Sequence, residues 1–270
     1  MRAFDLAREW PASATSICVV DRNGETRTFG DTSRVSRIAS VSKLLTAWAA
    51  LVAVEEGSTE LSTGIGQQDC TLAHLLAHAG GYSFEGSVPI VAVNRKRIYS
   101  NTGYDMITGH LEQATQIAFN EYLRDAVLEP LGMQKSFLNG SGAKDVVSSV
   151  SDLTRFVREL RAPRLISSQS ATVITTVQFG ELEGVVPGVG RFDPCSWGCG
   201  AEIHSTKHPH WMGARNSASA FGHFGGTGSF LWHDPTANIS CVGLCELEFD
   251  AWALHHWPIF FDAVLDELTR

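Results

Sequence analysis

The most constraining feature of the chain is an almost uninterrupted apolar run, residues 44–54, directly after Ser40-Val41-Ser42-Lys43. The run is apolar on nearly every side of a helix, which predicts a helix buried in the core. Residues three apart on a helix are neighbours, so Ser40 and Lys43 are expected to share one face. A lysine amine at that distance can accept the hydroxyl proton and turn serine into a nucleophile. The alternative is that Ser40 only caps the helix, a role that serine fills well.

Composition and charge indicate a soluble globular protein with small-molecule partners. Charged residues make up 19% and hydrophobic residues 44% of the 270, which is ordinary for such a protein. The net charge of −8, without a Lys/Arg-dense segment, disfavours binding to nucleic acid or to anionic membranes. The length allows one large domain or two lobes that share a core.

Neither the start of the chain nor the apolar run indicates a membrane or secretory route. Residues 1–16 contain four charged side chains and no continuous apolar segment, so no signal peptide is predicted. Residues 44–54 are too few to span a bilayer. We therefore expect a cytoplasmic protein without membrane partners, whose oligomeric state the sequence leaves open.

The six cysteines are expected to be reduced thiols rather than a disulfide framework. Cys195/Cys199 and Cys241/Cys245 form two Cys-x-x-x-Cys pairs, but zinc sites usually use tighter spacing. No metal site and no cofactor are predicted.

Two groups of histidines could suggest a metal site. His74 and His78 have the i, i+4 spacing of a ligand pair, but no glutamate follows His74, and structural roles are favoured. His204, His208 and His210 cluster in a segment expected to be a solvated loop, with a place in a cleft or on a metal as alternatives.

The order of predicted elements indicates an α+β fold. An Asn-Gly turn predicts a hairpin of residues 16–20 and 25–29. Helices are predicted at 3–10, 72–78, 104–112, 116–128, 152–160 and 250–268, and strands at 197–204, 223–232 and 238–247. We expect an antiparallel β-sheet built from both ends of the chain and flanked by helices, with an inserted all-α lobe. Residues 1–55 and 185–270 would form the sheet lobe and 56–184 the helical lobe.

Two further segments offer groups that an activated serine needs. Tyr99-Ser100-Asn101 places a phenol and an amide two residues apart before a predicted helix. The phenol can relay protons, and the amide can hold a lysine amine or a substrate carbonyl. The glycine-dense segment 222–229 allows close backbone approach to a ligand and leaves an N–H free for an oxyanion.

In this order, Ser-x-x-Lys, Tyr-x-Asn and His-x-Gly resemble the serine β-lactamase and penicillin-binding protein superfamily. The likeness is greatest to the class C enzymes, the related DD-peptidases and the family VIII carboxylesterases. Residues 75–81 resemble the family's Leu-Leu-x-His-x-x-Gly element, and residues 129–133 its Pro-Leu-Gly-Met turn.

The resemblance implies a role for each matching residue on the helical side of a site between the two lobes. Ser40 would be the acylated nucleophile and Lys43 its base. Tyr99 would shuttle protons with Lys43, and Asn101 would orient Lys43 or the substrate. Burial and the positive end of the helix dipole both favour the neutral form of Lys43, which a general base requires.

On the strand side, His223 would occupy the first place of the family's Lys-Thr-Gly, and Gly225 the third. The backbone N–H groups of Ser40 and Gly226 would form the oxyanion hole. Phe224 stands where many members carry a threonine or serine that binds the β-lactam carboxylate, and phenylalanine cannot donate that hydrogen bond.

The sequence therefore predicts a serine hydrolase that acts on a small ester or amide through an acyl-enzyme. Esterase, peptidase or amidase activity is expected ahead of efficient β-lactam hydrolysis. The alternative is a non-catalytic, penicillin-binding-like binding or scaffold protein. The complete set of motif residues argues against that alternative.

Overall fold

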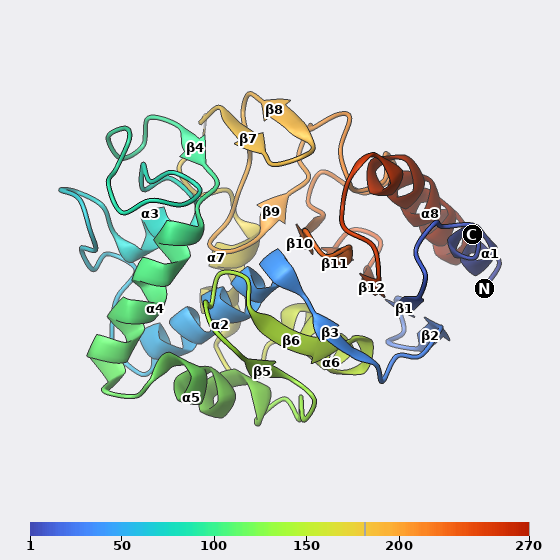
Figure 1. The fold of residues 1–270 in the computed structure, drawn as a ribbon, viewed down its shortest axis with the longest axis horizontal. Coiled ribbons are helices and arrows are strands. Elements are labelled where there is room, and N and C mark those ends of the chain that lie inside the picture. Colours follow the sequence, from blue (N-terminus) through green and yellow to red (C-terminus); the bar gives the residue numbers. More distant parts are fainter. Residues whose placement is uncertain (181, 270) are drawn as a thin grey trace.

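Both ends of the chain contribute to one antiparallel sheet in the computed structural model, which describes residues 1–180 and 182–269 (Figure 1). The strand order is β2-β1-β12-β11-β10-β9, so the first and last long strands lie side by side. The strands are β1 (Thr15–Val20), β2 (Thr26–Phe29), β9 (Glu202–Ile203), β10 (Phe221–Gly225), β11 (Ser229–Asp234) and β12 (Ile239–Cys245). The predicted hairpin at the N-terminus is confirmed, with Gly24 at φ +82° in its turn.

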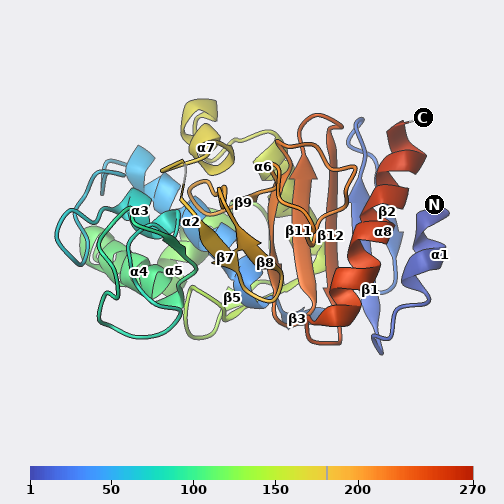
Figure 2. The same ribbon diagram turned by 90° about the horizontal axis from the view of Figure 1, so that it is seen from above.

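Helices cover both faces of this sheet, whose strands stand side by side in Figure 2 with α8 in front of them. On one face α8 (Ala251–Thr269) packs beside α1 (Ala3–Ala7), close to both termini. On the other face α6 (Val150–Arg161) contacts β1, β11 and β12, and α2 (Ser42–Glu55) shares the same core. The expected α+β class, an antiparallel sheet flanked by helices, is confirmed.

Helix α2 is the buried helix that the apolar run predicts. Every residue from 42 to 53 is buried, including Lys43, whose relative exposure is 0%. Ser40 lies just before α2, in the 3₁₀ turn η1 (Ala39–Val41). The residue in the capping position is Val41, so Ser40 is not the helix cap.

The segment between α2 and β9 is mainly helical but also contains short strands. Its helices are α3 (Leu72–Leu76), α4 (Asn101–Thr115), α5 (Phe119–Leu123), the π-helical turn η2 (Arg124–Leu128), α6 and α7 (Ser168–Thr175). Its short strands belong to two three-stranded sheets. In one, β6 (Val146–Ser149) lies between β5 (Phe137–Leu138) and β3 (Val35–Arg37), which precedes α2; in the other, β7 (Gly184–Val186) lies between β4 (Arg97–Ile98) and β8 (Gly190–Phe192). Strands of two to four residues are too short to show an alternating pattern, so the sequence did not reveal them.

Two predicted strands differ from the structure. Residues 223–232 form parts of two strands, because a turn at residues 226–228 separates β10 from β11 and Gly228 takes φ +77° there. Only Glu202–Ile203 of the predicted strand 197–204 is a strand, joined by an isolated bridge from Trp197 to Glu202. Gly200, at φ +113°, breaks that run. Among the described residues, no helix is both long and apolar enough to cross a bilayer.

Candidate active site

The nucleophile segment is held in place by the turn that joins β10 to β11 and by the first residue of β11. The Ser229 hydroxyl donates to the Ile38 carbonyl at 2.6 Å, and the Thr227 hydroxyl donates to the Arg37 carbonyl at 2.9 Å. Ala39, directly before Ser40, has φ +43°, which is rare for a residue with a side chain. Such backbone persists only where the surroundings enforce it, and here two side chains anchor it.

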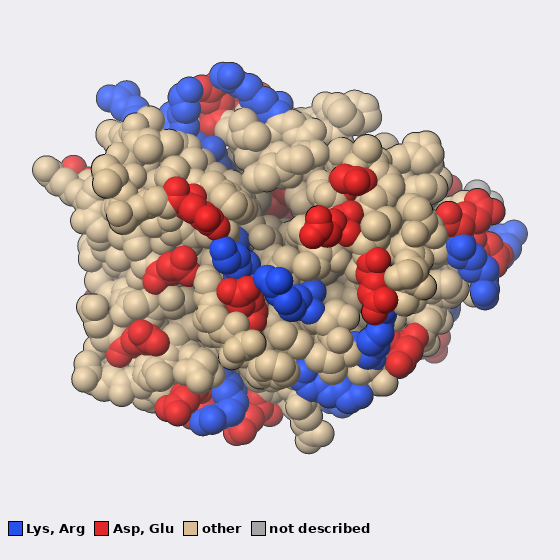
Figure 3. Space-filling model, in the orientation of Figure 1, with Lys and Arg blue, Asp and Glu red and all other residues tan. Residues whose placement is uncertain are grey.

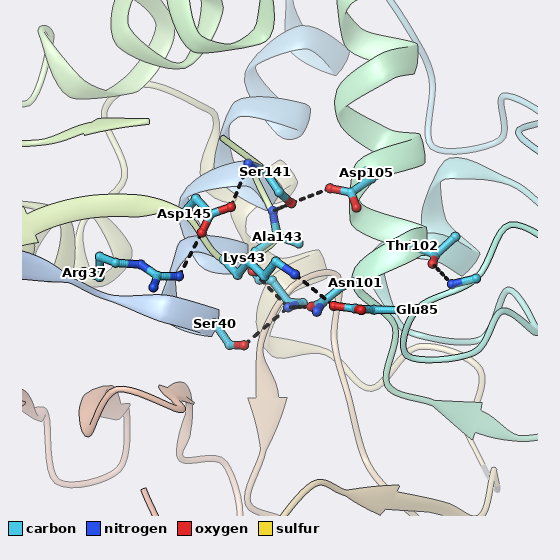
Figure 4. Close-up of polar contacts among 12 residues, drawn as sticks. Arg37, Ser40, Lys43, Glu85, Asn101, Thr102, Asp105, Ser141, Ala143 and Asp145 are labelled. Carbon is cyan, nitrogen blue, oxygen red and sulfur yellow. Dashed lines mark hydrogen bonds and ion pairs between the residues drawn. The ribbon is translucent and has the colours of Figure 1, made fainter. Parts of the chain in front are cut away.

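Lys43 has a hydrogen-bonding arrangement that suits a base. Its Nζ lies 3.4 Å from Ser40 Oγ, 2.7 Å from Asn101 Oδ1 and 2.9 Å from the Ala143 carbonyl oxygen (Figure 4). The Ala143 carbonyl only accepts hydrogen bonds, and the Asn101 oxygen does the same. The two N–H bonds of a neutral amine are used on these acceptors, so its lone pair faces the Ser40 hydroxyl.

Burial lowers the pKa of Lys43 from 10.5 to about 7. The nearby Asp105 carboxylate raises that pKa and Lys144 lowers it, but desolvation is the largest effect. About half of the molecules therefore carry the neutral amine at pH 7, which lets Lys43 accept a proton without high pH.

Asn101 is fixed at the start of α4. The helix is capped by Ser100, whose hydroxyl accepts from the Gly103 N–H at 3.0 Å. The Asn101 N–H donates to the Phe84 carbonyl at 2.9 Å, and the residue is 3% exposed. The amide oxygen is thus presented to Lys43 by a rigid helix end.

Tyr99 and His223 form a second polar pair, on the other side of Ser40. The Tyr99 hydroxyl lies 3.3 Å from His223 Nε2, and His223 Nδ1 lies 2.6 Å from the Phe224 carbonyl oxygen. The carbonyl only accepts, so Nδ1 carries the hydrogen and Nε2 accepts from the Tyr99 O–H. Burial, helped by the charge of Lys43, lowers the pKa of His223 to about 3, so the ring is neutral.

Burial keeps Tyr99 in its phenol form. It raises the pKa of Tyr99 well above its ordinary value, and a hydrogen bond with Ser40 offsets only part of that effect. Lys43 Nζ lies 4.6 Å from the centre of the Tyr99 ring. A cation at Lys43 therefore interacts with the ring face.

The glycines after His223 let β10 approach the nucleophile. A Cβ at Gly225 would lie 2.4 Å from the Ile38 carbonyl oxygen and 2.3 Å from Ser229 Oγ, which leaves no room for a side chain. A Cβ at Gly226 would meet nothing within 4 Å. The Gly226 carbonyl accepts from the Phe249 N–H at 2.9 Å, and no acceptor among the described residues meets the Gly226 N–H.

The structure brings all seven predicted residues into one region. A cavity of about 270 Å³ opens at Ser40. It is lined by Ser40, Phe84, Tyr99, Val186, Pro187, Gly188, Trp197, His223, Phe224, Gly226 and Phe249. Lys43 and Asn101 lie behind Ser40, and Gly225 supports the wall. Figure 3 shows acidic and basic side chains interspersed over this face of the molecule, without a large field of one sign.

Two groups at the site were not predicted. The Ala143 carbonyl belongs to a loop and has no sequence signal, because every residue carries a backbone carbonyl. His78, expected to be structural, packs its ring 4.5 Å from that of Tyr99 and accepts from the Ser100 N–H at 3.2 Å. Burial, together with the charge of Lys43, holds its pKa well below the usual range.

The histidine segment near β9 is not the solvated loop that the sequence predicts. His204 and His210 are buried, and only His208 is exposed. Their neighbour Glu202 accepts from Lys207 Nζ at 2.9 Å and from His210 Nε2 at 2.9 Å. Burial alone would raise the pKa of Glu202, but the Lys207 charge and the hydrogen bonds from Lys207 and His210 hold it below its usual range.

Glu202 also accepts from Trp211 Nε1 at 2.7 Å, so the buried carboxylate has three donors. The predicted exposure was wrong because a polar, histidine-rich composition is typical of solvated loops. Here the polar groups are buried because they bind the internal carboxylate of Glu202. The six cysteines are buried free thiols, as expected. Within residues 1–180 and 182–269, no three His, Cys, Asp or Glu side chains are placed to hold a metal ion.

Comparisons with known proteins identify the family of this chain. The sequence profile of the family described as Beta-lactamase matches residues 15–253. The chain is similar to a crystal structure of a β-lactamase from Mycobacterium bovis, with 41% identity and a TM-score of 0.97 over 99% of this chain and 100% of that one. It shares the fold of an octameric penicillin-binding protein homologue from Pyrococcus abyssi, with 17% identity and a TM-score of 0.76 over 98% of this chain and 76% of that one. A search of curated proteins found no match. The chain therefore belongs to the β-lactamase family.

Proposed function

We propose that the protein is a serine hydrolase that cleaves a small ester or amide through an acyl-enzyme on Ser40. The observation that carries this proposal is the environment of Lys43. This buried amine has a pKa of about 7, and two of its N–H groups are fixed on acceptors. Its nitrogen lies 3.4 Å from the Ser40 hydroxyl oxygen, so the amine is arranged as a general base.

In acylation, Ser40 Oγ attacks the substrate carbonyl carbon while its proton passes to Lys43. An oxygen–carbon bond forms, and the carbonyl electron pair moves to oxygen, next to the N–H groups of Ser40 and Gly226. Collapse of this intermediate re-forms the carbonyl and breaks the bond to the leaving group. The leaving group takes the proton of the Lys43 ammonium by way of the Tyr99 hydroxyl, which restores the neutral amine.

Deacylation repeats these steps with water as the nucleophile. Water attacks the acyl carbon and gives a proton to Lys43 through Tyr99, and the released Ser40 oxygen takes that proton back. Neutral His223 holds the Tyr99 hydroxyl at 3.3 Å without adding a second positive charge beside Lys43. Asn101 keeps the amine directed at Ser40.

The Gly226 N–H, which meets no acceptor within the described part of the chain, supports an oxyanion hole. Gly226 follows directly on β10, its side is open to the cleft, and its carbonyl is held by Phe249. A donor that is fixed before the reaction stabilises the developing negative charge without reorganisation.

Phe224 supports an ester or amide substrate ahead of efficient β-lactam hydrolysis. Its ring packs 4.2 Å from that of Phe249 and 5.4 Å from that of Trp211, and it brings no hydroxyl to the cleft. We assign the protein to the branch of class C enzymes, DD-peptidases and family VIII carboxylesterases. We also place its cleft between a sheet lobe, residues 1–55 and 185–270, and a helical lobe, residues 56–184.

The test compares Ser40→Ala with Ser42→Ala. Ser42 belongs to the same segment, but its hydroxyl accepts from the Val146 N–H at 3.1 Å in the core. Ser40→Ala is expected to lose p-nitrophenyl butyrate hydrolysis by about 1,000-fold or more and to escape fluorophosphonate labelling, while Ser42→Ala retains both. Turnover and labelling that survive Ser40→Ala would exclude the proposal. Wild-type enzyme is expected to prefer the ester over a chromogenic cephalosporin in kcat/KM.

A further inference from the structure

A second cavity, of about 520 Å³, adjoins the cleft at Ser40. Phe84, Tyr99 and Pro187 line both cavities, so the two spaces share a wall. The Phe84 ring lies nearly parallel to that of Tyr99, with centres 6.0 Å apart. A molecule whose carbonyl reaches Ser40 can therefore extend into the second cavity past these rings.

The side chains around the second cavity are mainly apolar. Phe84, Ile90 and Val185 line it although they are 50%, 60% and 54% exposed. A single exposed apolar side chain is common on protein surfaces, but a group of them around a hollow is typical of a binding site. Ile98, on β4, lines the same space.

The cavity wall is preformed by the pairing of β4 with β7. Ile98 pairs with Val185 in register, and a Cβ at Gly184 would lie 2.6 Å from the Arg97 carbonyl oxygen, so the two strands approach closely. Arg97 is buried beneath them and donates to the carbonyls of Cys195, Ala77, Gln178 and Phe179. All three guanidinium nitrogens of Arg97 are engaged by these carbonyls, so Arg97 supports the wall from beneath.

The remaining charges at this cavity are paired with each other. Glu183 contacts Lys96 Nζ at 3.0 Å and also binds the Arg191 guanidinium. All three side chains are at least partly exposed, and basic side chains gather over β4, β7 and β8 at the top of Figure 3. The polar groups thus form a rim, whereas the inner wall offers apolar contact.

We propose that this second cavity binds an apolar arm of the substrate, an alkyl or aryl group of several carbons attached to the ester or amide that Ser40 attacks. The inference rests on the proposed hydrolase function and names its substrate class. Each methylene buried against Ile90, Ile98 and Val185 stabilises the bound ester, so longer chains are better substrates until the cavity is filled.

The first test is the chain-length dependence of wild-type enzyme. Two ester series are measured below their aggregation concentrations, one lengthened on the acyl side and one on the alcohol side, from two to ten carbons. We expect kcat/KM to rise by about three- to fourfold per methylene in at least one series before it levels off. Flat or falling values in both series would overturn the inference, provided that the wild type is active and Ser40→Ala is not. Loss of the proposed function would instead appear as activity that is independent of Ser40.

The second test places a carboxylate in the cavity wall. Val185→Asp and Ile90→Asp are expected to lower the ratio of long-chain to short-chain kcat/KM by about tenfold or more. Val35→Asp is the matched control, because Val35 is also on a short strand and 43% exposed but lies outside the cavity. An unchanged ratio in both cavity variants, with melting temperatures like that of the control, would overturn the inference.

Discussion

The Asn101→Asp substitution tests whether Lys43 is the base, because it changes charge with almost no change in shape. The Asn101 oxygen lies 2.7 Å from Lys43 Nζ in a buried setting. An aspartate there places a carboxylate against the amine and favours the ammonium form. The variant is expected to hold its base protonated at neutral pH.

The size of the effect follows from the pKa of Lys43. In the wild type that pKa is about 7, so the acid limb of kcat/KM is expected near neutral pH, with activity falling as the pH is lowered. A carboxylate in direct contact shifts the pKa of a partner by about 1 to 3 units, toward the charged form. The neutral fraction at pH 7 then falls from about one half to between roughly 9% and 0.1%, which lowers activity about 5- to 500-fold.

The assay is the pH dependence of p-nitrophenyl butyrate hydrolysis, corrected for the spontaneous reaction at high pH. The acid limb of Asn101→Asp should move upward by the same 1 to 3 pH units, and activity should recover in alkaline buffer. Asn101→Leu, which loses the hydrogen bond but adds no charge, should lose activity without that upward movement. An Asn101→Asp limb that coincides with the wild type would refute the assignment of Lys43 as the titrating base.

Three further predictions concern stability. Burial holds the pKa of Lys43 at about 7 instead of 10.5, which costs the fold roughly 4 to 5 kcal/mol at neutral pH, so K43M should be inactive but more resistant to urea at pH 7. The unfolded chain binds a proton that the folded chain lacks between these pH values; wild-type stability therefore rises with pH, and the K43M advantage should shrink toward pH 10. Gly225→Ala should destabilise the protein by about 1 to 3 kcal/mol in denaturant melts, whereas Gly226→Ala, which has open space, should stay within about 0.5 kcal/mol. Glu202→Gln should cost about 3 to 5 kcal/mol, because the buried Lys207 loses its counter-charge, and an unchanged melt would contradict the ion-pair account.

Local patterns sufficed where neighbours in sequence decide the structure. The burial of α2 follows from an apolar run that leaves the helix with no polar face to turn toward solvent. The β1–β2 hairpin follows from its Asn-Gly turn. The pairing of Ser40 with Lys43 follows from helical spacing, even though Ser40 lies in a 3₁₀ turn, because residues three apart are neighbours there too.

Distant contacts were beyond that reach. The sequence placed the histidines near β9 in solvent, whereas the carboxylate of Glu202 draws His210 and Lys207 into the interior. Residues 223–232 read as one strand because a turn of three residues leaves the apolar pattern on both sides intact. In the first case the structure depends on a buried carboxylate, and in the second on the register between two strands. Neither is visible in a short stretch of sequence.

The sequence by itself determined the fold class and the residues from which a catalytic site could be built. It did so because burial, turn chemistry and helical spacing are local properties, and because the order of three motifs resembled a known superfamily. Only the tertiary structure decided how these residues act on one another. Desolvation by the whole core brings the pKa of Lys43 to about 7, and the Ala143 carbonyl, from a loop 100 residues away, helps aim the amine at Ser40. The apolar cavity lined by β4 and β7 likewise exists only once these two distant strands pair.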